Sequence, residues 1–306
     1  MKKSIVLIML FLSFVGKTQD KFKPSGKIEF TSFVNFSNSQ NFNKFELTRA
    51  HLGYNYNFSE QFSGRIVFDA SNNSAILKYG YLQYEKNGFN LRFGLVPNAQ
   101  IGKIEKFWNH RYIMKTFQDK YSMATSSDYG IDMYYKFNKF INVVFSVLNG
   151  EGYKSSEIDS VFKYCAGVTI HPNQNLIIHA YYDKMKKNIA QQTISLMSGY
   201  TTNKFNILFE YNYQANSKYR KNYDYFGYSI CGTYNFNKKI SIVSRYDMIS
   251  YSNVWKNSKS SYSEGSQYIF GIEFNPVEGI RISPNTQLWI GDTNIYSFNL
   301  NVELKI

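Results

Sequence analysis

The sequence predicts an all-β protein, a transmembrane antiparallel β-barrel of about 16 strands with one long infolded loop. Three observations indicate this class. Apolar and polar residues alternate with a period of two along most of the chain. After the N-terminus, no segment has the roughly 18 consecutive apolar residues of a membrane helix. Tyr (27 residues) and Phe (26 residues) favour pleated sheets and are abundant.

The N-terminal residues 1–19 predict a secretory signal peptide. Two lysines precede the apolar run 5–15, and the small residues Gly16 and Thr18 follow it. Such a run is too short to cross a bilayer as a helix, and the order of charged, apolar and small residues is typical of a signal peptide. A buried N-terminal helix is the alternative. We expect the barrel to comprise residues 20–306.

The alternation divides this part of the chain into strand segments. In the last segment, apolar residues from Tyr296 to Ile306 share one face, and polar residues from Asn299 to Lys305 share the other. The sixteen expected strands are 26–38, 44–57, 62–71, 76–86, 89–96, 128–137, 140–148, 160–171, 175–184, 192–202, 205–215, 223–236, 239–250, 266–275, 279–290 and 295–306. Tilted strands of about ten residues just span the apolar part of a bilayer.

The connections are expected to alternate between two rims. Short turns are expected at 87–88, 138–139, 203–204 and 237–238, and longer polar connections at 149–159, 184–191, 216–222 and 251–265. Bacterial membrane barrels have short turns facing the periplasm, longer loops facing outward and both termini on the turn side. This pattern predicts the bacterial outer membrane.

One connection, about 97–127, is much longer than the others. Its apolar residues include Ile101, Ile104, Phe107 and Trp108, so we expect it to pack inside the barrel and constrict the lumen. Sixteen strands enclose too wide a space for side chains to fill, so the apolar strand faces should point to lipid and the polar faces to water. Aromatic residues near strand ends would form interfacial girdles, with ordinary sheet packing as the alternative; they are Tyr54, Tyr56, Phe58, Tyr135 and Phe137.

Basic residues are predicted to line the lumen. The formal charge falls from +13 to about +10 once three lysines leave with the signal peptide, which favours lipid or small anions over nucleic acid as partners. The candidate pore-lining and anion-binding residues are Arg65, Arg92, Lys103, Lys106, Arg111, Lys115, Lys120, Arg245 and Arg281. Clustered cations in a narrow aqueous path attract anions and repel cations. Solvated loop charges or lipopolysaccharide contacts are the alternative for each residue.

No catalytic, metal or cofactor site is expected. The four histidines (His51, His110, His171 and His179) show no metal-ligand spacing, and no glycine-rich phosphate loop is present. His51 and His179 have lumen-facing parity. Cys165 and Cys231 fall four strands apart, too far to form a disulfide.

Five short segments resemble the phosphate-selective porin O and P family. They are FELTRAHLG (45–53), RIVFD (65–69), LRFGLVP (91–97), VLNG (147–150) and RYD (245–247). They follow the family order and extend over most of the chain. The resemblance implies a sixteen-stranded trimeric porin whose channel is lined by lysine and arginine.

The sequence therefore favours an outer-membrane porin for passive diffusion of small solutes, preferring anions such as phosphate. Two alternatives remain open. The first is a non-channel outer-membrane barrel, either an enzyme or a structural anchor. The second is a soluble exported β-sandwich that binds carbohydrate through exposed aromatic residues.

Overall fold

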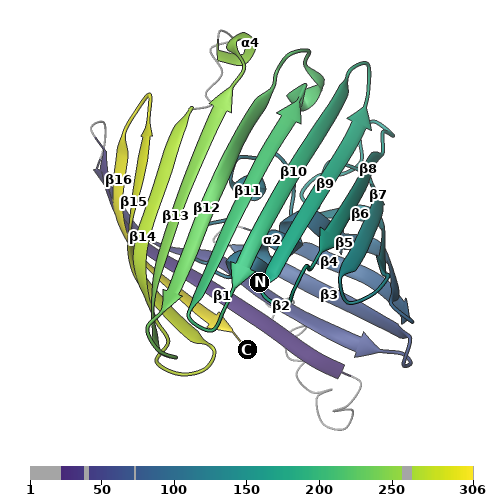
Figure 1. The fold of residues 1–306 in the computed structure, drawn as a ribbon, viewed down its shortest axis with the longest axis horizontal. Helices are drawn as coiled ribbons and strands as arrows, with labels where there is room; N and C mark the ends of the chain where they lie inside the picture. The colour runs from purple at the N-terminus through teal and green to yellow at the C-terminus, as the bar shows by residue number, and fades with distance from the viewer. Residues whose placement is uncertain (1–21, 38–40, 72–73, 257–263, 306) are drawn as a thin grey trace, which may run out of the picture.

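A computed structural model describes residues 22–37, 41–71, 74–256 and 264–305, so the expected signal peptide lies outside the described residues. Sixteen strands form one closed barrel in which each strand pairs antiparallel with its neighbours in the chain (Figure 1). The strands are β1 Phe22–Ser37, β2 Asn41–Asn57, β3 Phe62–Ser71, β4 Ser74–Lys86, β5 Phe89–Pro97, β6 Ser127–Lys136, β7 Ile141–Leu148, β8 Lys163–Ile170, β9 Leu176–Lys186, β10 Ala190–Thr201, β11 Phe205–Ala215, β12 Tyr225–Asn235, β13 Ile240–Tyr251, β14 Gly265–Phe274, β15 Ile280–Gly291 and β16 Ile295–Lys305. The predicted fold class is confirmed, and the expected strand ends differ from these by only a few residues.

The barrel closes where the first strand meets the last. β1 pairs with β16 from Lys27 opposite Lys305 to Ser37 opposite Ile295. Closure satisfies backbone groups that would otherwise be left unpaired at the two edges of an open sheet. In hydrocarbon such unpaired groups are very costly, so closure suits the sheet to a membrane.

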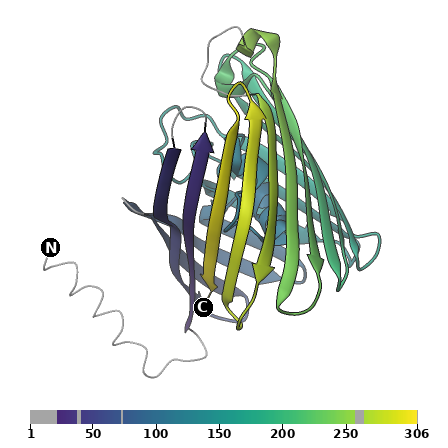
Figure 2. The same cartoon turned by 90° about the vertical axis from the view of Figure 1, so that its left-hand side faces the viewer.

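The connections alternate between two rims. Helix α4 (Asn253–Lys256) lies at one rim and the C-terminus at the other (Figures 1 and 2). We call the rim with α4 the loop rim and the opposite one the turn rim. The expected long connection 184–191 is wrong, because β9 and β10 continue in register until Lys186 pairs with Ala190. Side chains still alternate between inward and outward positions at this end of β9, but the outward positions hold Lys184 and Lys186 and no apolar residue.

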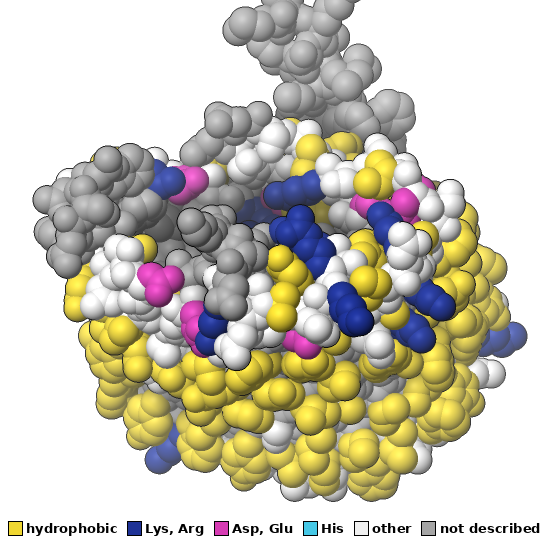
Figure 3. All heavy atoms as spheres, turned by 90° about the horizontal axis from the view of Figure 1, so that it is seen from above, with side chains coloured by type: hydrophobic (Ala, Val, Ile, Leu, Met, Phe, Trp, Pro, Cys, Tyr) yellow, Lys and Arg dark blue, Asp and Glu magenta, His cyan; other side chains and the backbone are white. Residues whose placement is uncertain are grey.

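The outer wall of the barrel is apolar. Phe45, Phe93 and Phe145 are 90%, 64% and 52% exposed, and Figure 3 shows a continuous apolar wall below the loop rim. Aromatic rings pair near the turn rim, with 4.9 Å between the ring centroids of Tyr56 and Phe58. Such a band flanked by aromatic residues is typical of a lipid-facing surface. Among the described residues, no helix is long and apolar enough to span a membrane.

The segment between β5 and β6, residues 98–126, folds into the barrel. We call it the infolded loop. It contains α2 (Ala99–Trp108) and α3 (Phe117–Lys120), neither of which was expected from the sequence. Asn98 caps α2 by accepting hydrogen bonds from the backbone N–H groups of residues 100 and 101, and Asn109 ends it in a left-handed conformation with φ 55°.

The infolded loop packs against the inner wall formed by β10–β14. Its buried apolar residues are Ile104, Trp108, Tyr112 and Ile113, and their partners on the wall are Met197, Leu208, Cys231, Val243 and Ile269. Two wall glycines leave room for loop aromatics. A Cβ on Gly199 would lie 2.4 Å from the Phe107 ring, and one on Gly227 would lie 2.3 Å from the Phe117 ring. Cys165 and Cys231 are both free and buried.

Candidate functional site: the lumen around the infolded loop

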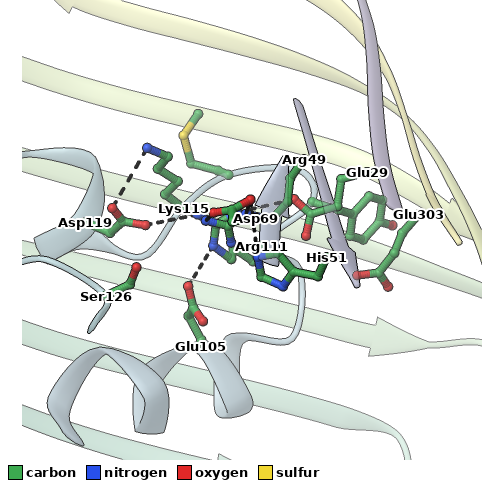
Figure 4. Close-up of polar contacts among 12 residues, drawn as sticks. Glu29, Arg49, His51, Asp69, Glu105, Arg111, Lys115, Asp119, Ser126 and Glu303 are labelled. Carbon is green, nitrogen blue, oxygen red and sulfur yellow. Dashed lines mark hydrogen bonds and ion pairs between the residues drawn. The ribbon is translucent and has the colours of Figure 1, made fainter. Parts of the chain in front are cut away.

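An arginine of the infolded loop forms the centre of a buried charge cluster. Arg111 lies between the two loop helices and is 8% exposed. Its Nε donates to Glu105 at 2.7 Å, its Nη2 to Asp119 at 3.1 Å and its Nη1 to Glu29 of β1 at 3.3 Å (Figure 4). Burial lowers the pKa of Arg111, but the three carboxylates outweigh this effect and raise it. The cluster therefore ties both loop helices to β1.

A second cluster on β2–β4 faces the first. Arg49 makes a two-pronged contact with Asp69, at 3.2 Å from Nε and 3.0 Å from Nη2, and His51 Nε2 lies 3.4 Å from the same carboxylate. Lys78 is 1% exposed and donates to Ser126 at the end of the infolded loop. Neither Arg49 nor Lys78 is among the predicted lumen residues. The alternation along β2 places Arg49 on the inward face, so the sequence could have identified it. Lys78 is the extra residue of a β-bulge opposite β3, so a strict alternation along β4 assigns it to the outward face.

Most predicted cations on the strands lie on the inner wall in ion pairs. Arg92 Nη2 lies 2.8 Å from Asp132, Arg245 Nε lies 2.7 Å from Asp247, and Arg281 pairs with Glu303. Lys120 of α3 donates to Gln267 at 2.8 Å and lies 3.9 Å from Asp247. Burial lowers the pKa of Lys120 to about 7 despite the nearby carboxylate. The three arginines therefore line the lumen as components of the wall, with their charges largely compensated by carboxylates.

Three other predicted cations make no ion pair within the described part of the chain. They are Arg65, Lys103 and Lys106. The Arg65 guanidinium lies 5.6 Å from the centroid of the Tyr79 ring. Lys103 Nζ donates to Thr169 at 2.7 Å, and its pKa falls to about 8 through burial and the charge of Lys106. Lys115 is intermediate between the paired and unpaired cations, because its half-exposed side chain makes only a long contact of 3.9 Å with Asp119.

Two cavities lie on opposite sides of the infolded loop. The one at the loop rim has a volume of about 390 Å³, and the one at the turn rim about 890 Å³. Charged residues lining the first are Arg49, Arg111, Lys115, Lys154, Lys163, Lys218, Asp69 and Asp119. Those lining the second are Arg65, Arg92, Lys103, Lys106, Lys136 and Glu85. Cations outnumber carboxylates in both, and Figure 3 shows basic side chains gathered around the hollow at the loop rim.

Comparison with solved structures finds outer-membrane porins. Pseudomonas putida OprB aligns with a TM-score of 0.76 at 7% identity, over 94% of this chain and 95% of that one. The anion-selective porin from Comamonas acidovorans aligns with a TM-score of 0.74 at 9% identity, over 93% and 99%. OmpF from Salmonella typhi aligns with a TM-score of 0.70 at 9% identity, over 92% and 97%.

Sequence comparison adds no relative, since no family model matches the chain and no curated protein does. At identities below 10%, the structural likeness shows the fold alone. The chain has the fold of the bacterial outer-membrane porins. With its closed sheet and apolar outer wall, it is a β-barrel of the outer membrane.

Proposed function

We propose that this barrel is a porin for passive diffusion of small anionic solutes, with phosphate among them. One observation carries the proposal: the cavities on both sides of the infolded loop contain more cations than carboxylates. A solute crossing the barrel along these cavities meets positive potential on either side of the constriction. Such a path concentrates anions and repels cations.

The three predicted cations that make no ion pair within the described residues are the proposed determinants of selectivity. Arg65, Lys103 and Lys106 line the cavity at the turn rim, where their charge is available to a solute. Arg111 has a different role in this proposal, because three carboxylates already surround it. It would hold the constriction in place.

The remaining parts of the proposal follow the sequence analysis. Residues 1–19 direct export, the barrel assembles as a homotrimer in outer-membrane lipid, and transport uses no metal, cofactor or catalytic step. The resemblance to the phosphate-selective porin O and P family supports this assignment. So does the fold shared with a porin described as anion-selective.

The test is the reversal potential of the purified protein in a planar bilayer across a potassium chloride gradient. We expect a chloride-selective current that added phosphate reduces. The double variant Lys103→Glu/Lys106→Glu should shift the reversal potential toward cation selectivity, whereas Lys238→Glu in an exposed turn should leave it unchanged. Equal reversal potentials for the double variant and the wild type would contradict the proposal.

The second candidate is a non-channel barrel, and the packing at the constriction favours it. Glu29 and Lys78 are 0% and 1% exposed, so the infolded loop fits closely against β1–β4. A barrel closed in this way would act as a structural anchor. Folded wild-type protein without current, together with current through Arg111→Ala, would support this candidate.

An enzymatic barrel is the weaker form of that candidate. His110 Nε2 lies 3.1 Å from Glu273, and the Tyr112 hydroxyl donates to the same carboxylate at 2.7 Å. All three side chains are buried where the infolded loop packs on the wall. We propose that they fasten the loop and have no catalytic role.

A further inference from the structure

The outward face of β9 carries two lysines. Lys184 and Lys186 share the outward parity of Ile178 and Tyr182, while the alternate residue Met185 is buried. Both lysines are exposed, and neither forms an ion pair within the described part of the chain. They are therefore free to meet a partner outside the barrel.

This pair is isolated on an otherwise uncharged surface. From β8 to β14 the structure describes every strand residue, and Lys184 and Lys186 are the only charged residues at outward positions. Across the sheet, Lys184 lies between Tyr164 of β8 and Gln192 of β10. The Tyr182 hydroxyl donates to Gln192 at 2.8 Å, which fixes this amide beside the lysine.

The depth of the lysines is set by the aromatic residues next to them. Tyr182 and Tyr213 face outward in one register row across β9–β11, near the loop rim. Outward tyrosines at strand ends mark the interface between hydrocarbon and headgroups. Lys184 lies about 7 Å beyond Tyr182 toward the loop rim, and Lys186 about 7 Å further. Both ammonium groups are then at the level of lipid headgroups.

We propose that Lys184 and Lys186 form a binding site for the phosphate groups of an anionic lipid in the leaflet at the loop rim. Two lysines whose Cα atoms lie about 7 Å apart on one strand face can direct their ammonium groups to one phosphate or to two neighbouring ones. Directly below, the exposed side chains of Ile178, Ile194 and Leu196 offer an apolar surface for acyl chains. Because the two lysines lie next to this apolar surface, the expected ligand is a lipid. Inorganic phosphate has no acyl chain that could contact the surface. The proposal depends on the membrane location and is independent of conduction.

The test is native mass spectrometry of the purified barrel in detergent. The probe is a glycolipid carrying phosphate monoesters, such as lipid A, compared with the same lipid after enzymatic dephosphorylation. We expect the wild type to bind the phosphorylated form more tightly. Each lysine should contribute roughly fivefold in affinity, so Lys184→Gln/Lys186→Gln should lose most of the preference.

The matched control is Lys86→Gln. Lys86 is exposed and shares the outward parity of Leu82, but it lies at the turn rim. The Lys86→Gln variant should bind the lipid as the wild type does. Unchanged electrophoretic mobility of unheated samples would show that all variants are folded. Equal binding of the phosphorylated lipid to the double variant and wild type would overturn the proposal. So would equal binding of the two lipid forms to the wild type, or displacement of the lipid by millimolar inorganic phosphate.

Discussion

The two sides of the lumen hold the infolded loop in different ways. Against β10–β14 the loop buries apolar side chains, and aromatic rings occupy the space left by Gly199 and Gly227. Against β1–β4 it meets charged side chains, with Arg111 bound to Glu29 and Lys78 bound to Ser126. The apolar side fixes where the loop packs. On the charged side, Arg49, Asp69 and Arg111 line the cavity at the loop rim, so we expect the proposed solute path on this side.

The largest effect is expected from removing the charge that joins the loop to β1. Arg111→Ala leaves Glu29, Glu105 and Asp119 without their shared partner, and breaking a buried ion pair in this way costs about 3–5 kcal/mol. The measurement is the free energy of unfolding by denaturant in detergent micelles. Lys115→Ala is the control, because its half-exposed contact should contribute less than about 1 kcal/mol. Similar losses in both variants would contradict the assigned role of Arg111.

A smaller effect is expected on the apolar side. In Gly199→Ala the new methyl group would lie 2.4 Å from the Phe107 ring, so the Phe107 side chain must move and the loop adjusts around it, at a cost of about 1–3 kcal/mol. The same measurement applies, together with single-channel conductance, which should change as the loop moves. Gly232→Ala is the control on the outward face of β12, because its Cβ would have no neighbour closer than 3.6 Å. If the two alanine variants behave alike, the loop is not seated on Gly199.

The start of α2 offers a third test, between the two sides. Asn98→Ala removes the side-chain oxygen that accepts from the backbone N–H groups of residues 100 and 101, which should cost about 1 kcal/mol. Asn98→Asp keeps an acceptor at the same position and should retain stability. A stable alanine variant would show that packing alone maintains this helix.

The smallest effect is a pH dependence of anion selectivity through Lys103, which lines the cavity at the turn rim. The pKa of Lys103 is lowered to about 8, so this lysine is charged at pH 7 and loses its proton as the pH rises to 9. Anion selectivity should fall over this interval, by less than in the Lys103→Glu/Lys106→Glu variant. Lys103→Arg stays charged and should remove this part of the dependence. An identical pH profile in the arginine variant would exclude Lys103 as its source.

Much of the fold could be predicted because its signal is local. A strand with one face toward lipid and the other toward water must alternate, and this alternation located all sixteen strands. It failed at 184–191, where outward lysines replace apolar residues although the ladder continues. The helix α2 was also missed, although Asn98 followed by apolar residues at 101, 104 and 108 is a recognisable helix signal.

The sequence by itself determined the strands, the parity that turns Arg65, Arg92 and Arg245 inward, and the existence of a long apolar connection. The tertiary structure alone decided which cations are compensated. Arg111 and Glu29 are separated by 82 positions in the chain, and Lys120 and Gln267 by 147, so no local pattern records either contact. These pairs form because closure of the barrel brings β1 and β14 around the same loop. Parity gives the direction of a side chain, whereas its electrostatic partners depend on how distant segments pack.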